Sequence, residues 1–385
     1  MDYSLQHHEA LIGSSVSELP TPAFLVRKRV IEDNIARLHQ DVDNLGIAFR
    51  PHVKTLKTLE VTRLMLGKKH KKIVASTLAE VRGALPLVAE GLLDEVLLGL
   101  PINKSALKQL PEIRKSVRIV LLVDHEQHVD LLEELPEQQP WDVFIKIDVG
   151  SRRAGVPPDS PRLSPLIRRV QSSRAASLYG FYCHAGHSYG DRTTEAAEAT
   201  LNSEIKGVLH AAGLAPPDQP LVVSVGATPT AHVVSSLKAS APSNVTIELH
   251  AGNFPVNDLQ QLSTGVISES QLAVRVLAEV CGVYPERNEV LVNAGTIALS
   301  KEASGFPGFG NVAGKDAWYV SRVSQEHGIL SVLEGKEGRA ADFRVGDKVS
   351  LLCAHACITA AAFHVFYVVD EDDVVRETWV PWKGW

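Results

Sequence analysis

The sequence has few of the features that mark secreted, membrane or nucleic-acid-binding proteins. It has 385 residues but only four cysteines, too few for a disulfide framework in a chain of this length. No apolar run reaches the roughly 18 residues that a membrane span requires, and the first 20 residues lack the apolar segment of a secretory signal. These absences predict a protein of a reducing, cytoplasmic compartment with no membrane association.

Charge of neither sign dominates the chain. The 39 Lys and Arg residues are outnumbered by 45 Asp and Glu residues, and the net charge is −6. The basic residues are scattered and are not interleaved with aromatic residues, so nucleic acid is not an expected partner. With 45% hydrophobic residues, the chain can build one large domain and a smaller one.

Strand-like and helical segments alternate over the first two thirds of the chain. Eight alternations over this length predict an α/β fold with a closed (β/α)₈ TIM barrel, although an open doubly wound sheet gives a similar pattern. A brief strand at 21–26 and a helix at 28–45 precede them. The strand-like runs are at 47–49, 73–75, 95–98, 117–123, 143–147, 178–183, 221–225 and 245–249, and the main helical segments are at 59–68, 78–90, 126–134, 161–172 and 191–212.

The pattern changes from about residue 266. Short β-type runs separated by Gly, Asp and Asn predict a second, mostly β domain. We therefore expect a barrel over residues 21–265 and a β domain formed by residues 1–20 with 266–385. The β-type runs are at 273–280, 290–292, 318–320, 328–333, 348–352 and 364–369.

The first predicted barrel strand ends in a basic cluster. Ile47-Ala48-Phe49 runs into a proline and delivers Arg50, His52 and Lys54 to a loop. A lysine at the mouth of a strand can form a Schiff base with an aldehyde such as pyridoxal phosphate. The alternative is a solvated basic loop.

The ends of the later strands provide further candidates, because the chemistry of such barrels gathers on the loops that follow each strand. Arg153 follows the fifth strand and could contact a cofactor, or could be a solvated loop arginine. Tyr182 and His184 share one face of the sixth strand, so both are expected to point into the barrel mouth. His184 could equally be a satisfied core histidine, and Tyr189 follows as a looser candidate.

The loops after strands seven and eight hold phosphate in many barrels, since backbone amides point at an anion there. Gly226 and Thr228 follow strand seven, and Gly252 and Asn253 follow strand eight. Thr228 before Pro229 is also typical of a plain helix start. Combined with Lys54, these residues favour a phosphorylated cofactor.

A His-x-Cys pair marks the β domain. On a strand, His355 and Cys357 would lie on one face, with Cys353 at the other end of it. Imidazole and thiolate together suit zinc, and two protein ligands would leave positions for water or a substrate oxygen. A buried thiol beside a histidine is the alternative.

Together these motifs resemble a known family, the eukaryotic-type zinc-dependent D-serine dehydratases. Their wider group is the alanine-racemase-like pyridoxal phosphate enzymes of fold type III, which includes D-threonine aldolase. The resemblance extends over nearly the whole chain from Thr21. It rests on Arg50-Pro51-His52-Val53-Lys54-Thr55, His184-Ala185-Gly186-His187-Ser188-Tyr189, Ser224-Val225-Gly226-Ala227-Thr228-Pro229-Thr230, Ser324-Gln325-Glu326-His327-Gly328 and His355-Ala356-Cys357.

The resemblance implies a barrel with pyridoxal 5'-phosphate on Lys54, a β domain with Zn²⁺ on His355 and Cys357, and a homodimer. Family aldolases usually have His-x-Asp at the metal, so Cys357 favours dehydration. The loop His250-Ala251-Gly252-Asn253-Phe254 departs from the pattern of many relatives, which have an arginine- or glutamine-type residue there.

The expected reaction is the conversion of D-serine to pyruvate and ammonia, by removal of the Cα proton and metal-assisted loss of hydroxide. Three alternatives remain open at this point. They are retro-aldol cleavage of D-3-hydroxy amino acids, dehydration of 3-hydroxyaspartate, and a non-catalytic pyridoxal phosphate carrier.

Overall fold

A computed structural model describes residues 5–135, 139–237 and 241–385. The chain forms two compact units, one of residues 1–35 with 255–381 and the other of residues 36–254 with 382–385. The boundary expected at residue 21 therefore lies further along, within helix α2 (Lys28–Leu45). The reason is that β1 (Ala23–Arg27) pairs with β10 (Val274–Tyr284) and β16 (Phe366–Val369), which are strands of the β unit.

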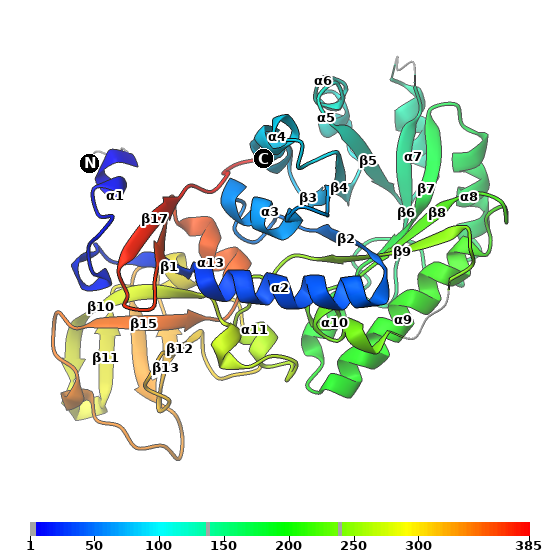
Figure 1. Ribbon diagram of the computed structural model, residues 1–385. Coiled ribbons are helices and arrows are strands. Elements are labelled where there is room, and N and C mark those ends of the chain that lie inside the picture. Colours follow the sequence, from blue (N-terminus) through cyan, green and yellow to red (C-terminus); the bar gives the residue numbers. More distant parts are fainter. Residues whose placement is uncertain (1–4, 136–138, 238–240) are drawn as a thin grey trace. The chain divides into compact units, whose positions relative to one another are not determined.

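The unit of residues 36–254 contains eight parallel strands (Figure 1). They are hydrogen-bonded in the order β2-β9-β8-β7-β6-β5-β4-β3, and a parallel bridge between His52 and Val74 joins the two ends into a barrel. The predicted (β/α)₈ barrel is thereby confirmed, and each predicted strand coincides with an observed one. The strands are β2 (Ala48–Pro51), β3 (Lys72–Ala75), β4 (Glu95–Pro101), β5 (Arg118–Val123), β6 (Trp141–Ile147), β7 (Ala176–Cys183), β8 (Leu221–Val225) and β9 (Val245–Ala251).

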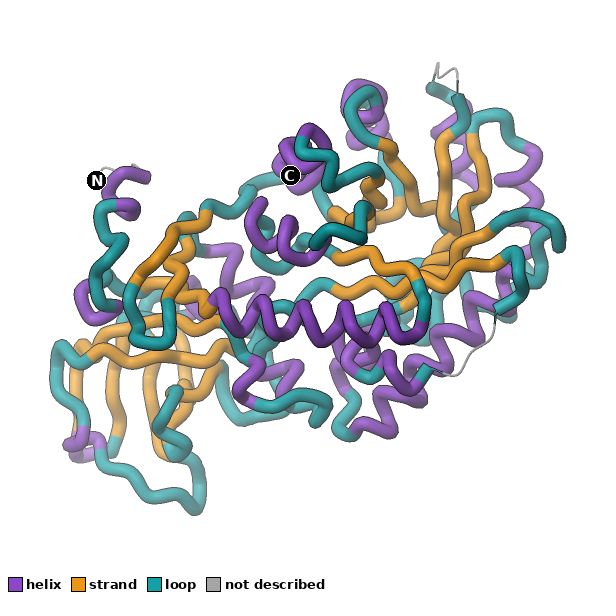
Figure 2. The backbone as a smooth tube through the Cα atoms, viewed as in Figure 1, coloured by secondary structure: helices purple, strands orange, loops and turns teal. Residues whose placement is uncertain are grey.

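Helices alternate with these strands along the chain (Figure 2). Several begin at a threonine whose hydroxyl accepts the N–H three residues on, as Thr58, Thr77 and Thr193 do, which satisfies an otherwise unpaired donor. The helices are α3 (Leu59–Leu66), α4 (Leu78–Ala89), α5 (Lys104–Leu107), α6 (Leu110–Arg114), α7 (Glu126–Glu133), α8 (Leu163–Ser172), α9 (Thr194–Ala212) and α10 (Thr228–His232). None of the described helices is both long and apolar enough to cross a membrane.

The barrel interior combines an apolar layer with a buried ion network. Arg50 is fully buried, and its Nε and Nη2 donate to Glu248 and Glu95 at 2.8 and 2.5 Å. Arg50 thus belongs to the inside of the barrel and does not enter the loop with Lys54. The apolar layer consists of Val74, Leu97, Val120, Leu122, Phe144 and Tyr182.

The β unit is built on a nine-stranded sheet in the order β11-β14-β13-β12-β15-β10-β1-β16-β17. Strand β10 also pairs with β11, so six of these strands close on themselves as a second, antiparallel barrel. The strands not yet given are β11 (Glu289–Val292), β12 (Gly310–Val312), β13 (Trp318–Val323), β14 (Gly328–Val332), β15 (Lys348–Cys353) and β17 (Val375–Trp379), and the helices are α1 (Leu5–Glu9), α11 (Leu259–Leu262), α12 (Thr296–Leu299) and α13 (Ala356–Ala362).

Candidate active site

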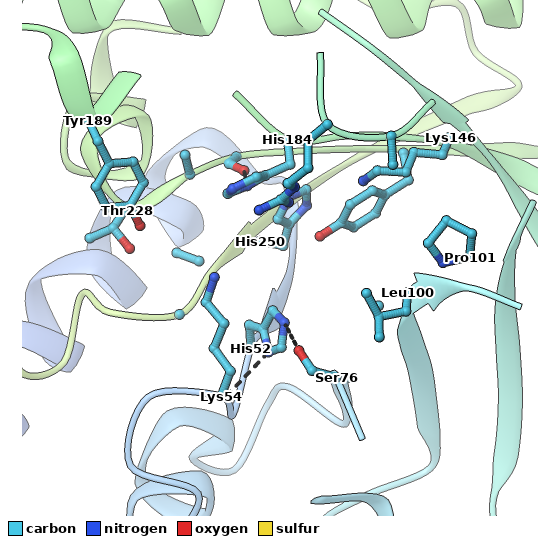
Figure 3. Close-up of a pocket in the computed structure, with 18 residues that line it drawn as sticks. His52, Lys54, Ser76, Leu100, Pro101, Lys146, His184, Tyr189, Thr228 and His250 are labelled. Atoms are coloured by element: carbon cyan, nitrogen blue, oxygen red, sulfur yellow. Dashed lines mark hydrogen bonds between the residues drawn. The ribbon is translucent and has the colours of Figure 1, made fainter. Parts of the chain in front are cut away.

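A cavity of about 540 Å³ lies at the C-terminal ends of the barrel strands (Figure 3). Most of the residues predicted for a cofactor site line it. The predicted lining residues are Lys54, Arg153, Tyr182, His184, Tyr189, Gly226, Thr228 and Gly252.

Lys54 reaches the cavity from the loop after β2, and Figure 3 shows its amine pointing inward. Gly252, after β9, makes room for it. A Cβ at this position would lie 3.3 Å from Lys54 Cε and 3.3 Å from the His52 Cβ, closer than most Cβ contacts. Glycine at this position therefore gives the lysine side chain its path into the cavity.

His52 supports the backbone beside the lysine. Its Nδ1 accepts the Lys54 N–H at 3.3 Å, so Nε2 carries the proton and donates to Ser76 Oγ at 3.2 Å. Burial, followed by the nearby Lys54 ammonium, lowers the pKa of His52 well below its ordinary value. The imidazole is therefore neutral, and it connects the loop that carries Lys54 to the loop that carries Ser76.

His184 connects the ends of β7 and β8. Its Nδ1 donates to the Gly226 carbonyl at 2.9 Å, which leaves Nε2 as an acceptor. Burial and then Lys54 lower the pKa of His184 well below its ordinary value, so the ring is neutral. Gly226 has φ +141°, and a Cβ there would lie 2.0 Å from the His250 carbonyl oxygen, so only glycine fits.

One wall of the cavity is aromatic and cationic. The rings of Tyr182 and His250 stack with centroids 4.1 Å apart, and Lys146 Nζ lies 4.7 Å from the centre of the Tyr182 ring. Burial, followed by Arg153, lowers the pKa of Lys146 to about 8. Among the described residues, Lys54, Lys146 and Arg153 line the cavity and no carboxylate does. The cavity is therefore suited to an anionic ligand.

Glu204, on α9, lies outside the cavity but connects two of its loops. Its Oε1 accepts the N–H groups of Ala185 and Gly226 at 3.0 and 3.1 Å. The residue is fully buried, and burial raises the pKa of the carboxyl to about 7 despite these donors. One carboxylate thus supports the backbone on both sides of the His184–Gly226 contact.

The structure places one predicted cofactor residue differently. Asn253 does not line the cavity. It is fully buried, and its backbone N–H donates to the Thr228 hydroxyl at 3.0 Å, so it holds the loop that presents Thr228.

Four further residues line the cavity although no cofactor role was predicted for them from the sequence, namely Lys146, His52, His250 and Ser76. Lys146 offered a usable signal, because it is a cation between Ile145 and Ile147 in the otherwise apolar second half of strand β6. Its side chain comes from within β6 and not from the loop after the strand, where the chemistry of such barrels usually gathers.

The predicted strand for the His-x-Cys pair is wrong. Strand β15 ends at Cys353, His355 precedes α13, and Cys357 lies in the first turn of that helix. The segment after His355 is rich in alanine, which favours helix, and the Asp258 carboxylate accepts the Ala356 N–H at 2.8 Å.

The two side chains nevertheless meet. His355 is hydrogen-bonded to Cys357, and its buried Nδ1, 3.5 Å from a Glu302 carboxylate oxygen, has no hydrogen-bond partner within the described chain. An imidazole and a thiol with an unsatisfied ring nitrogen fit a zinc ion. The described residues include no group of three or more His, Cys, Asp or Glu placed to hold a metal, so the pair would supply two ligands.

Comparison with known proteins agrees with both units. Residues 26–240 match the family described as "Alanine racemase, N-terminal domain", and residues 273–369 match the "Putative serine dehydratase domain". The D-serine dehydratase of Schizosaccharomyces pombe is 44% identical over 97% of this chain and 94% of its own length. The chain belongs to the D-serine dehydratase family.

Further members of this family and its relatives match over similar lengths. The D-serine dehydratase of Saccharomyces cerevisiae is 33% identical over 97% of this chain and 98% of its own. The solved structure of D-threo-3-hydroxyaspartate dehydratase from a Delftia species superposes with a TM-score of 0.85 at 31% identity, covering 96% of this chain and all of that one. Membership of this group of lyases, with its alanine-racemase-like barrel, supports pyridoxal phosphate as the cofactor.

Proposed function

We propose that this D-serine dehydratase family member converts D-serine to pyruvate and ammonia with pyridoxal phosphate and zinc. The observation that carries the proposal is the cavity itself, where Lys54 points inward among cationic side chains and no described carboxylate lines the wall. An anionic cofactor and an amino acid carboxylate both suit such a site.

Lys54 would hold the cofactor and act on the substrate. Bound pyridoxal phosphate supplies an electron sink for negative charge at the substrate Cα. Once released from the cofactor, the Lys54 amine is a base that can take the Cα proton. The Lys54 backbone N–H donates to His52 Nδ1, and this contact restricts the positions that the Lys54 amine can reach.

The remaining residues would bind anions and exclude water. Thr228 and Gly252 present hydroxyl and backbone groups suited to the cofactor phosphate, and Gly226, whose N–H is already accepted by Glu204, lines the cavity beside them. Arg153 and Lys146 would orient the substrate carboxylate or the phenolic oxygen of the cofactor. Tyr182, stacked on His250, provides an apolar wall that keeps solvent from the reacting carbon.

Hydroxide is a poor leaving group, so its departure needs assistance. The His355–Cys357 pair could provide it by holding a metal ion. We infer that His355 and Cys357 hold zinc, whose Lewis acidity would assist departure of the β-hydroxyl. A site with only two protein ligands leaves coordination positions for the substrate oxygen.

Two finer inferences accompany this function. The family resemblance favours a homodimer, which sedimentation analysis would test as a species of twice the mass of the 41.8 kDa chain. All four cysteines are free thiols, which is consistent with a reducing, cytoplasmic compartment.

A second substrate is supported by the relatives and by the charge of the cavity. The Delftia enzyme that shares 31% identity is named for D-threo-3-hydroxyaspartate, and three cations line this cavity. A substrate with a second carboxylate could use a cation that D-serine leaves unused.

Product analysis tests the proposal. The purified enzyme with pyridoxal phosphate and zinc is incubated with D-serine, L-serine, D-threo-3-hydroxyaspartate and D-threonine. Pyruvate from D-serine and none from L-serine is the expected result. Oxaloacetate formed faster than pyruvate would favour the second candidate. Glycine and acetaldehyde from D-threonine, without pyruvate from D-serine, would identify an aldolase and overturn the proposal.

A further inference from the structure

The segment Trp382–Trp385 lies in the same compact unit as the barrel and contacts the loop that carries Lys54. The backbone N–H of Trp382 donates to the Lys57 carbonyl at 2.7 Å. Lys57, three residues after Lys54, has φ +54°, in the left-handed region that lysine rarely adopts. A residue in such a conformation persists only where its surroundings hold it.

The Trp382 ring packs against a glycine on α4. A Cβ at Gly83 would lie 2.3–2.4 Å from three carbon atoms of that ring, so the indole lies directly on the helix backbone where any larger residue would displace it. Glycine within a helix costs stability relative to alanine. The close approach of the ring provides a reason for glycine at this position.

A chain of polar contacts leads from Lys57 back to the reactive lysine. Lys57 Nζ lies 3.1 Å from the fully buried Glu80 carboxylate, which also accepts the Ser76 N–H at 2.6 Å. Ser76 Oγ bonds to His52 Nε2, and His52 Nδ1 accepts the Lys54 N–H, as Figure 3 shows. The Lys57 carbonyl is thus held by Trp382 while its amine is held within the network that braces Lys54.

We propose that Trp382–Trp385 is a strap that fixes the Lys54 loop, with Trp382 as a positioning residue for cofactor capture. The inference rests on the proposed role of Lys54. Without the strap, Lys57 can relax from its left-handed conformation, which would loosen its contact with Glu80. The Lys54 amine would then be less well placed to react with the cofactor aldehyde.

Four variants separate this role from a general contribution to stability. Trp382→Ala removes the ring, and Trp382→Phe keeps a smaller one. Gly83→Ala displaces the ring from outside the cavity, although helix propensity alone predicts that it stabilises α4. Trp385→Ala is the matched control, because Trp385 is 95% exposed.

The measurement is the affinity and rate with which the cofactor-free protein binds pyridoxal phosphate, followed by absorbance, with the melting temperature recorded alongside. Trp382→Ala and Gly83→Ala are expected to weaken capture roughly three- to tenfold. Both variants keep the backbone N–H of residue 382, but without the packed ring its hydrogen bond to the Lys57 carbonyl is expected to open, and one hydrogen bond is worth about that factor. Trp382→Phe should restore part of the loss and Trp385→Ala should change nothing. Should Trp382→Ala not fold, the Gly83→Ala result decides.

Hydrogen exchange at residues 54–57 in the cofactor-free protein provides a readout that needs no cofactor. Faster exchange in Trp382→Ala and Gly83→Ala than in Trp385→Ala supports the strap, whether or not the wild-type protein binds pyridoxal phosphate. Failure of the wild-type protein to bind pyridoxal phosphate would overturn the proposed function and not the strap. Unchanged exchange together with unchanged capture in both variants would overturn the strap.

Discussion

The imidazole of His184 donates from Nδ1 to the backbone carbonyl of Gly226, 2.9 Å away, and so connects the ends of two neighbouring barrel strands. Both residues face the cavity. The N–H of the same glycine donates to the carboxyl of Glu204, which lies outside the cavity. The backbone N–H and C=O of one residue, Gly226, are therefore fixed by two different elements. This arrangement makes the loop that offers Gly226 and Thr228 rigid before any ligand binds.

Substitution of Glu204 should change the pH dependence of stability. Burial raises the pKa of this carboxyl to about 7 from 4.5, so the folded state retains a proton that the unfolded state releases. The contribution of this group is therefore fully present below about pH 4.5 and is lost as pH rises to 7. Relative to Glu204→Gln, which does not titrate, the wild-type free energy of unfolding should fall by about 3 kcal/mol across that range.

Urea unfolding at several pH values measures this difference. Glu198→Gln, on the same helix, is the control and should follow the wild-type curve. Parallel curves for the wild type and Glu204→Gln would contradict the burial of a titrating carboxyl.

Lys146→Met should stabilise the protein and weaken anion binding. Burial lowers the pKa of this ammonium to about 8 from 10.5, so at pH 7 the folded state carries a charge that water solvates better. At pH 7 the free energy of unfolding of the variant should exceed that of the wild type by about 1–3 kcal/mol. This difference should disappear as pH rises from 8 to 10.5, because in that range the unfolded wild type binds more protons than the folded one, so the wild type becomes more stable. Denaturant titrations of both proteins at pH 7 and 10 measure the stability difference. Titration with pyridoxal phosphate measures the affinity for the anionic cofactor. A variant less stable at pH 7 would contradict this prediction.

Cys357→Ala should separate cofactor binding from elimination. The thiol is one of two proposed zinc ligands in the β unit, so its loss should leave the absorbance of the bound cofactor intact and lower pyruvate formation from D-serine ~100-fold or more. Cys281→Ala, which removes an exposed thiol of the same unit, is the matched control. Undiminished turnover in Cys357→Ala would eliminate the proposed role of the metal.

Arg50→Met should destabilise the barrel although Arg50 does not line the cavity. The guanidinium is fully buried against Glu248 and Glu95. Its removal leaves the buried Glu248 without its ion-pair partner and leaves Glu95 with Arg118 and Lys72 as its remaining ion-pair partners among the described residues, which costs about 3–5 kcal/mol. Arg63→Met, which removes a half-exposed ion pair with Glu90, should cost less than about 1 kcal/mol. Chemical denaturation of both variants makes the comparison, and equal losses would contradict it.

The sequence predicted the barrel well because local periodicity is sufficient for parallel strands that alternate with helices. It could not assign β1, since the run Ala23–Arg27 has the same apolar character as a barrel strand. Its partners β10 and β16 lie about 250 and 340 positions further along the chain. Such long-range pairing is not visible in local patterns, so the domain boundary was misplaced.

The site was predictable wherever a residue follows a strand end, as Lys54, His184 and Gly226 do. Glu204 was not predictable, because its role depends on a helix face that turns toward two loops, and the sequence around it is that of an ordinary amphipathic helix. The contact of Cys357 with His355 was predicted, but for a strand. The two side chains meet because His355 has an extended backbone just before α13, since residues two apart within a helix do not face each other.

The most direct test of the account asks which lysine holds the cofactor, because Lys54 and Lys146 line the same cavity. The holoenzyme is reduced with borohydride, which fixes lysine-bound pyridoxal phosphate covalently, and is then digested and analysed by peptide mass spectrometry. The account predicts the phosphopyridoxyl group on Lys54 and an unmodified Lys146. A label on Lys146, or no labelled lysine in a protein that forms pyruvate, would contradict it.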